Sequence, residues 1–375
     1  MSDEHAILAP SSAGEWAYCA ASVSLSAQYP EEQTLAAQEG NAAHWLAAEM
    51  INRGLGGAPV ALAVAPNGIP IDDEMREGVQ AYVDDVLKTK EKLDKTAILQ
   101  IEHRVTMPAI HKDNWGTLDA VIYHRSAATI YLWDFKWGHG FVEVFENWQE
   151  IDYLAGVLNE LGDDKPDYDV VFRIAQPRSY HKDGSIREWR VKASDLSERF
   201  RHLNAKAHEA LSNDPTAEVG EHCKHCEGRR ACKALQAAAL DAADRSTDAT
   251  PLDLPPSALG RELAVLHRAI KLMESRVSGL EAQALAEIRG GKPVPGWGIE
   301  HSQGREFWNK PEAEILAIGE MFGVRLDKGV ALITPNAARK LGVDPSVVEL
   351  YASRNTGAAK LVQIDTTDAR KAFGG

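Results

Sequence analysis

Two charges inside an apolar run constrain the fold of this chain more than any other feature. The segment IYLWDFKWGHG, residues 130–140, carries Asp134 and Lys136 on either side of Phe135. Residues i and i+2 of a β-strand share a face, so the carboxylate and the ammonium would point the same way. For an Asp-x-Lys alone, an exposed salt bridge is the commoner arrangement, so other residues must decide between a site and a solvated face.

A second carboxylate lies where it would meet the first. Segments 116–124 and 129–137 read as strands, and RSAA joins them at residues 125–128. If this loop is symmetric, Asp119 lies opposite Asp134, with the two Cβ atoms about 5 Å apart. A slip of one residue would turn Asp119 to the other face. Opposed carboxylates destabilise a sheet unless a divalent cation, a shared proton or a neighbouring lysine offsets their repulsion.

This combination of residues predicts phosphate chemistry. Two carboxylate ligands on a rigid sheet suit a hard cation such as Mg²⁺ or Mn²⁺. A lysine beside them can hold an attacking water or stabilise the charge that develops on a phosphate. The residues therefore point to metal-assisted hydrolysis of a phosphodiester.

Hydrophobic periodicity predicts an α/β (α+β) domain with a mixed central sheet flanked by helices. Helices are expected at 33–55, 75–93, 147–162 and 193–213, and strands at 97–107, 116–124, 129–137, 168–176 and 185–192. A loop rich in Asp, Pro and Ser at 244–257 indicates a boundary. We therefore expect a first domain at 1–240, a linker at 241–257, and an accessory helical and mixed region at 258–375 that begins with a long helix.

The motifs resemble a known nuclease family. GTLDAVIYHRSAATIYLWDFKWG (116–138) is similar to the core of the PD-(D/E)XK superfamily in its RecB-like exonuclease branch, where an Asp after Gly-x-x precedes an Asp-x-Lys. GNAAH, which ends at His44, matches the upstream Gly-x-x-x-His of that branch. QEIDY, from Gln149 to Tyr153, matches its Gln-x-x-x-Tyr helix, and Glu102 lies in the strand before the hairpin. The order of the motifs is more specific than any one of them.

This resemblance implies a restriction-endonuclease-like core and a role for each matching residue. His44, Asp119, Asp134 and the backbone carbonyl of Phe135 would bind Mg²⁺ or Mn²⁺. Lys136 would position and activate the attacking water. Gln149 and Tyr153 would orient the scissile strand of DNA, and Glu102 would have an accessory role.

The chain has four cysteines, of which three form the pattern Cys-x2-Cys-x5-Cys at Cys223, Cys226 and Cys232, while Cys19 lies far upstream. Four thiolates suit either a structural zinc or a [4Fe–4S] cluster. Zinc is favoured by the spacing itself, with histidines nearby. One cysteine before a nuclease core and three after it resembles the iron–sulfur branch of RecB-like nucleases, which includes AddB, and this resemblance implies an iron–sulfur cluster.

Charge and hydropathy limit the partners of the chain. The net charge of −14 argues against a globally basic nucleic-acid binder, although residues 178–192 offer a local basic segment or merely a solvated hairpin. No apolar run reaches the roughly 18 residues of a membrane span, and residues 1–16 do not resemble a signal peptide, so we expect a cytoplasmic protein without a membrane partner.

Two softer matches add a biological context. LAPSSAGEWAYCAASVSL (8–25) and VPGWGIEHSQGREFW (294–308) resemble a phage and prophage family of undefined function. We therefore expect a metal-dependent DNA exonuclease of a phage-type recombination or replication system, in a bacterial host, with a recombination or single-strand-binding partner protein. The alternative is a non-catalytic DNA-binding or assembly protein that keeps the nuclease fold with a structural zinc.

Overall fold

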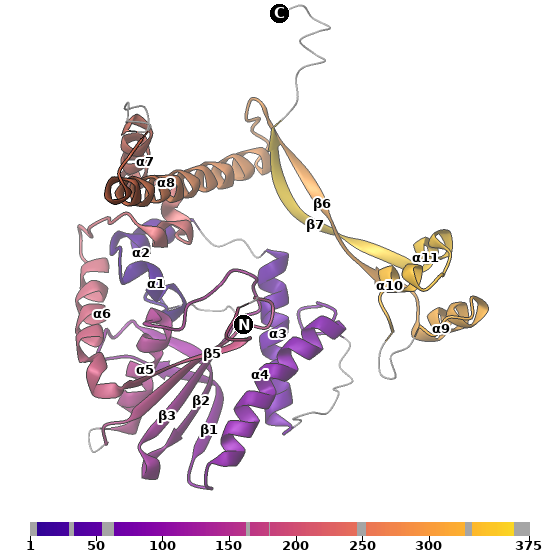
Figure 1. Ribbon diagram of the computed structural model, residues 1–375, viewed down its shortest axis with the longest axis horizontal. Coiled ribbons are helices and arrows are strands. Elements are labelled where there is room, and N and C mark those ends of the chain that lie inside the picture. Colours follow the sequence, from indigo (N-terminus) through magenta and orange to yellow (C-terminus); the bar gives the residue numbers. More distant parts are fainter. Residues whose placement is uncertain are drawn as a thin grey trace, which may run out of the picture. The chain divides into compact units, whose positions relative to one another are not determined.

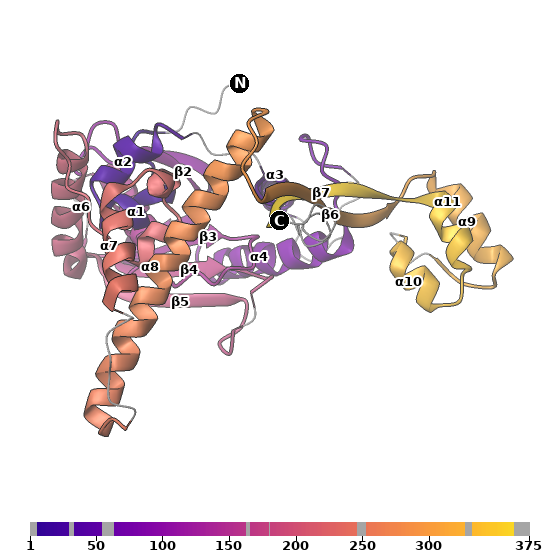
Figure 2. The ribbon, with the colours of Figure 1, turned by 90° about the horizontal axis from the view of Figure 1, so that it is seen from above.

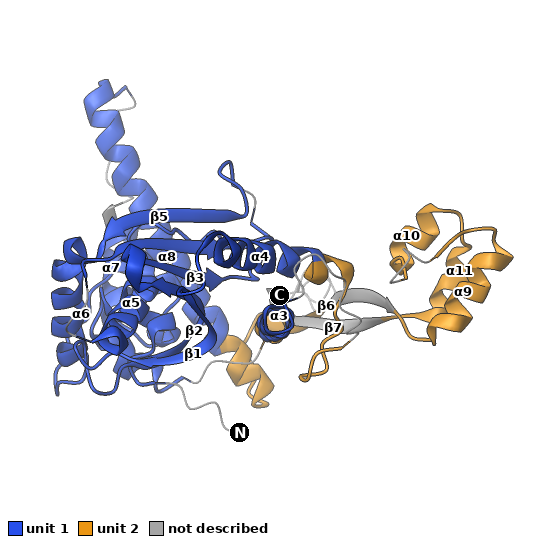
Figure 3. Cartoon of the chain, turned by 90° about the horizontal axis from the view of Figure 1, so that it is seen from below, with its two compact units in different colours: residues 1–32, 39–57, 77–283 blue, residues 33–38, 58–76, 284–375 orange. Residues whose placement is uncertain are grey.

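The computed structural model describes residues 6–29, 34–54, 64–162, 166–179, 181–245, 253–326 and 332–363 (Figure 1). Contacts divide the chain into two compact units, and each is described by itself (Figure 3). The first comprises residues 1–32, 39–57 and 77–283, and the second residues 33–38, 58–76 and 284–375. The expected boundary at 241–257 lies inside the first unit, because the helix that follows it packs back onto that unit.

A five-stranded mixed sheet forms the centre of the first unit (Figure 1). Its strands lie side by side in chain order: β1 Ile98–Thr106, β2 Trp115–His124, β3 Thr129–Phe135, β4 Asp169–Ala175 and β5 Ile186–Lys192. Only β3 and β4 run parallel, and the other neighbours are antiparallel. A parallel pair needs a crossover, which helix α5 (Trp148–Leu161) supplies. The expected mixed α/β architecture is confirmed.

The register of the β2–β3 hairpin is the one that a symmetric loop predicts. Ala120 pairs with Trp133, and Val121 pairs with Leu132. The turn is a short 3-10 helix, Arg125–Ala127, capped by Ala128, whose positive φ of 49° allows the chain to reverse. Asp119 and Asp134 are the next residues in this register.

Helices cover both faces of the sheet (Figure 1). The remaining helices of the first unit are α1 Ala13–Trp16, α2 Ala21–Ser26, α6 Ser197–Ala210, α7 Lys233–Arg245, and parts of α3 Leu35–Asn52, α4 Asp73–Lys92 and α8 Pro256–Arg289. Trp133 donates a hydrogen bond to Asp85 of α4 over 2.8 Å, whereas its neighbour Leu132 lies in the core with α5. Alternate residues of β3 therefore face different helix layers.

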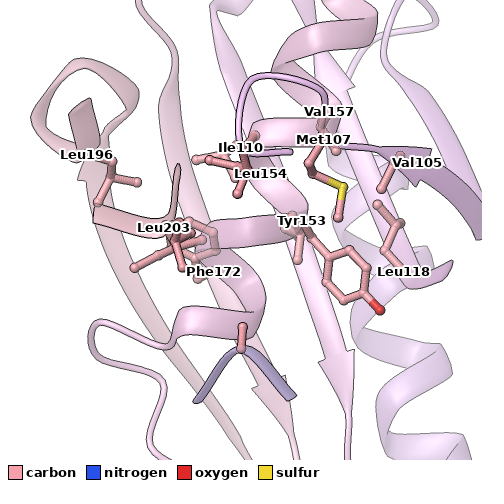
Figure 4. Packing of buried hydrophobic residues seen from close by; sticks show 14 of the residues in the cluster. Val105, Met107, Ile110, Leu118, Tyr153, Leu154, Val157, Phe172, Leu196 and Leu203 are labelled. Atoms are coloured by element: carbon pink, nitrogen blue, oxygen red, sulfur yellow. The ribbon is translucent and has the colours of Figure 1, made fainter. Parts of the chain in front are cut away.

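The core between α5, α6 and the sheet is shown in Figure 4. Leu154 of α5, Phe172 of β4 and Leu203 of α6 are fully buried in it. The helix α5 begins after Asn147, whose side chain accepts hydrogen bonds from the backbone N–H groups of Gln149 and Glu150. This cap and the apolar packing fix α5 over the strands that carry the predicted site.

In its described residues the second unit contains a two-stranded antiparallel ribbon, three helices of its own and the ends of α3, α4 and α8. The elements are β6 Trp297–Trp308, α9 Glu312–Met321, α10 Pro335–Lys340, α11 Pro345–Tyr351 and β7 Ala352–Gln363. Ile315, Leu326 and Val348 belong to a small core of its own. The first unit ends within α8, a continuous helix of 34 residues (Figure 2). No helix in the described ranges combines the length and apolar character that a membrane span requires.

Candidate functional site

Three carboxylates occupy equivalent positions on three adjacent strands. The β1–β2 pairs Ile101–Ala120 and His103–Leu118 flank Glu102 and Asp119. The β2–β3 register places Asp134 of β3 opposite Asp119 of β2. The sequence therefore brings Glu102, Asp119 and Asp134 into one row across the sheet, although only the second pair was expected from the hairpin.

Glu102 interrupts the regular pairing of this row. Its φ is +44°, in the left-handed region that residues other than glycine rarely adopt. Such a conformation costs about 1–3 kcal/mol and is often found at functional sites. One ligand atom from each of His44, Glu102 and Asp119 lies within 4.8 Å of the other two. The strained residue thus completes a group of three potential metal ligands.

His44 reaches the sheet from α3. Its Nδ1 lies 3.1 Å from Oδ1 of Asp119, and its ring contacts the ring of Phe135 edge-on, with centroids 5.2 Å apart. The other carboxylate oxygen of Asp119 accepts a hydrogen bond from the backbone N–H of Phe135 over 2.6 Å. Asp119 is therefore held on both sides, by an imidazole and by the backbone of the neighbouring strand.

Asp134 belongs to a second network. Its Oδ1 accepts a hydrogen bond from Nε2 of Gln149 over 2.9 Å and lies 3.1 Å from Nζ of Lys136. Lys136 in turn donates to Oε1 of Gln149 over 2.9 Å, so the amide joins both charged groups. Oδ2 of Asp134 is buried and has no hydrogen-bond partner among the described residues. The expected ligand set of His44, Asp119, Asp134 and Phe135 therefore stays a prediction, with Asp134 outside the compact group.

The charges of the site are unequal. Burial and the neighbouring Asp119 raise the pKa of Glu102 to about 7. Burial also raises the pKa of Asp134, against the opposing effect of Lys136. For Asp119, burial would raise the pKa, but His44 and the Phe135 N–H outweigh it and the pKa is lowered. The cluster holds more carboxylates than its nearby cations neutralise.

Lys136 stays charged in this setting. Burial would lower its pKa, but the carboxylates of Asp134 and Asp119 raise it above its ordinary value. An ammonium has three donors, of which Asp134 and Gln149 take two. The third donor can reach a water or a phosphate oxygen.

Tyr153 shares a face of α5 with Gln149, which hydrogen-bonds to it, and burial together with the nearby Asp119 and Asp134 raises its pKa. It is buried in the core, and its hydroxyl donates to the backbone carbonyl of Thr117 over 2.7 Å (Figure 4). The tyrosine therefore fixes α5 to β2, two residues before Asp119. Its expected contact with DNA stays a prediction.

Two residues near the site carry no signal in the sequence. Tyr82 of α4 stacks on Phe135, with ring centroids 4.9 Å apart. Glu150 is fully buried, and neither carboxylate oxygen has a hydrogen-bond partner among the described residues. Burial and the nearby Asp134 raise its pKa well above the ordinary value. Glu150 belongs to the QEIDY motif, but only the fold shows that its carboxyl interacts with Lys136.

A loop after Lys136 presents an aromatic ring at the same edge of the sheet. The buried Gln176 donates to the carbonyls of Gly138, over 3.0 Å, and Gly140, over 2.5 Å. The buried Arg187 donates to Gln176 and lies with its guanidinium 4.6 Å from the ring centroid of Phe141. Phe141 itself is 47% exposed. An exposed ring is thus supported from below by a cation and a hydrogen-bonded loop.

The four cysteines gather in one place. All of them are buried and outside any disulfide, and each sulfur has a hydrogen-bond partner. The backbone N–H groups of Glu218, Gly220 and Leu235 donate to three sulfurs over 3.4 Å, and Ser26 lies 3.5 Å from the fourth. Burial and the three other thiols raise the pKa of Cys223. Hydrogen bonds to sulfur are a usual feature of metal-bound thiolates.

Four thiolates suit either a structural zinc or a [4Fe–4S] cluster, and the choice between the two stays a prediction.

Residues 5–354 match the model of a protein family of unknown function, DUF2800. The match covers most of the chain, including both the sheet site and the cysteine site. The chain belongs to this family.

Proposed function

We propose that this member of the DUF2800 family is a metal-dependent DNA nuclease, acting as an exonuclease, with a PD-(D/E)XK-like core and a structural iron–sulfur cluster. The observation that carries the proposal is the group formed by His44, Glu102 and Asp119 next to the Asp134–Lys136 pair. An imidazole and carboxylates suit Mg²⁺ or Mn²⁺. A lysine beside such a group is what phosphodiester hydrolysis needs.

The residues fit a divalent cation for an electrostatic reason. Glu102, Asp119 and Asp134 lie side by side in one row across the sheet, and burial raises the pKa of Glu102 and of Asp134. The orphaned Oδ2 of Asp134 offers a further oxygen. His44, Glu102 and Asp119 would hold the ion, with Asp134 completing the set. When bound, the cation would polarise the phosphate and lower the pKa of a water.

The side chains supply the rest of the chemistry. Lys136 orients a water or a phosphate oxygen with its third donor and stabilises negative charge that develops there. Gln149 holds Lys136 and Asp134 in place through its amide. Phe141 would stack on a base of the bound strand in place of His181, whose ring now stacks on it with centroids 5.0 Å apart.

The cysteines would hold a [4Fe–4S] cluster with a structural role. Cys19 comes from the N-terminal segment and the other three from residues 223–232. The close approach of α2 to the second segment supports this role, because a Cβ at Gly228 would lie 2.5 Å from Leu25. A phage-type recombination or replication system, with a single-strand-binding partner, is the setting that the sequence resemblance favours.

The test is cleavage of end-labelled linear DNA by anaerobically purified protein with Mg²⁺ or Mn²⁺. Lys136→Ala should abolish cleavage. Lys192→Ala is the matched control, since Lys192 lies on the same sheet and pairs with Asp169 on the surface. If the wild-type protein cuts no end, gap or flap, the nuclease proposal fails, and a non-catalytic DNA-binding or assembly role takes its place. One zinc and no iron per chain would overturn the cluster proposal alone.

A further inference from the structure

Helix α8 has one buried face and one exposed apolar face. Leu272, Ser275 and Gly279 are buried and follow one face of the helix. A Cβ at Gly279 would lie 2.9 Å from the backbone of Arg230, so this face packs closely on the segment that carries the cysteines. Lys271 adds an ion pair with Glu221. The first face thus holds α8 on its own unit.

The second face is exposed. Its members are apolar and alternate at spacings of four and three residues: Leu259, Leu263, Leu266, Ile270, Met273, Val277 and Leu280. Six of them are 40–51% exposed. We call these seven residues the α8 stripe. A surface helix normally turns such a stripe toward a core, so its exposure requires an explanation.

The spacing of the stripe is that of a coiled coil. With Leu263, Ile270 and Val277 at position a, the other four members occupy position d over three heptads. The buried Leu272, Ser275 and Gly279 then occupy positions c and f, on the opposite side of the helix. The stripe is about 32 Å long at 1.5 Å per residue. The two faces can therefore be used at the same time.

We propose that two copies of this chain associate through the α8 stripe as a parallel two-stranded coiled coil. β-Branched residues at a, here Ile270 and Val277, with leucine at most d positions favour two parallel helices. Charges agree with this register. Arg276 at position g would face Glu281 at position e of the second copy. Glu262 would face His267 in the same way, and neither contact joins like charges.

A long helix of this kind could bind a partner, form an oligomer or extend a DNA channel, and the exposure of the α8 stripe favours the oligomer. The proposal does not depend on nuclease activity. It brings two cysteine-bearing segments onto the outer sides of one coiled coil, because each packs against the c and f positions of its own helix.

The experiment is sedimentation velocity of the full chain at micromolar concentrations. We expect the wild-type protein to sediment with twice the mass of one chain, and Leu266→Lys combined with Ile270→Lys to sediment as a monomer. Val265→Lys is the matched control, because Val265 is 55% exposed and adjacent to Leu266 but occupies position c. It should remain a dimer. A monomeric wild type, or a double variant that still dimerises, would overturn the proposal.

The direction of the helices is tested by Leu259→Cys. In a parallel pair the two introduced thiols face each other at position d, so mild oxidation should link the two chains. Val265→Cys, at position c, should not link them, and the native cysteines are buried. A dimer of the Leu259→Cys variant that fails to cross-link would overturn the parallel arrangement.

Discussion

The sheet site and the cysteine site both bring together buried groups that repel one another when ionised, and they stabilise these groups in different ways. On the sheet, protein groups already hold the carboxylates: His44 and a backbone N–H for Asp119, and Lys136 and Gln149 for Asp134. At the cysteine site the sulfurs are held by weaker hydrogen bonds, from backbone N–H groups and from Ser26. Cys226 meets Ser26, a residue 200 positions earlier in the chain.

The difference separates function from stability. Adjacent strands carry most of the sheet site, so its geometry follows from the fold, and the proposed ion would add chemistry to a site that is already formed. The cysteine site joins segments distant in sequence, so the proposed cluster would add a cross-link to the fold. Loss of the ion should therefore abolish activity and leave the fold, whereas loss of the cluster should weaken the fold itself.

The largest effect is expected from Asp119→Asn. The amide keeps the oxygen that accepts from the Phe135 N–H but removes the charge that pairs with His44. We expect cleavage of linear DNA to fall roughly 1,000-fold, as for loss of a charged group that contacts a catalytic metal. The melting temperature should change little. Kinetics with Mn²⁺ and thermal unfolding of the same preparation measure both quantities.

Asp169→Asn is the control for this prediction. Asp169 lies on β4 and pairs with Lys192 at the surface, so the same chemical change there should leave cleavage unaltered. If Asp119→Asn unfolds the protein, the sheet site depends on its charge for stability, and the contrast with the cysteine site is lost.

The next effect is expected from Cys226→Ser. A lost ligand should remove the cluster and with it a cross-link between residues far apart, which lowers the free energy of unfolding by about 2–4 kcal/mol. Iron content and denaturant unfolding measure the change. Removing iron from the wild-type protein should shift the unfolding midpoint by the same amount, and chelation should not shift it further in the variant. Equal stability with and without iron would contradict the structural role.

More of the geometry of the sheet site than of the cysteine site could be predicted from the sequence. The register of the hairpin follows from a four-residue loop between clear strands, so the neighbouring positions of Asp119 and Asp134 could be predicted. The inclusion of Glu102 could not, because it depends on a positive φ that no periodicity reveals. Gln149 and Tyr153 lie on one face of α5, as their helical spacing predicts. The spacing does not reveal that Gln149 joins Lys136 to Asp134, whereas the Tyr153 hydroxyl donates to the Thr117 carbonyl. For the cysteines, spacing predicts a shared site but does not distinguish iron from zinc.

A further buried carboxyl, that of Asp152, belongs to neither site and shows what burial alone does to such a group. Asp152 is fully buried and accepts one hydrogen bond from Asn114, over 2.7 Å. Burial raises its pKa to about 8. The folded state therefore keeps a proton that the unfolded state loses above about pH 4. Stability should fall as the pH rises from about 4 to about 8, because the unfolded chain binds fewer protons in this window.

Asp152→Asn should remove this loss of stability. The amide oxygen keeps the hydrogen bond from Asn114, and the new N–H₂ offers a donor near Asn114 Oδ1, which has no partner among the described residues. We expect the free energy of unfolding to rise by about 1–3 kcal/mol at pH 8, and by little at pH 4. Urea unfolding at both values measures the difference. Equal gains at both pH values would show that the change acts through packing rather than through the proton.

The smallest effect is expected from Phe141→Ala, and it concerns only the sheet site. Loss of a stacking ring should weaken DNA binding by about 1–2 kcal/mol, or roughly 5–30-fold in KM, with little change in kcat, melting temperature or iron content. Phe141→Trp should keep binding, whereas Phe141→Leu, which retains apolar bulk without an aromatic face, should not. If leucine binds DNA as well as phenylalanine does, the ring acts by packing on Arg187 and the loop, and the site ends at Lys136. If tryptophan keeps binding and leucine does not, the substrate-binding surface extends along the loop that Gln176 holds. The sheet site would then bind a substrate, whereas the cysteine site would have only a structural role.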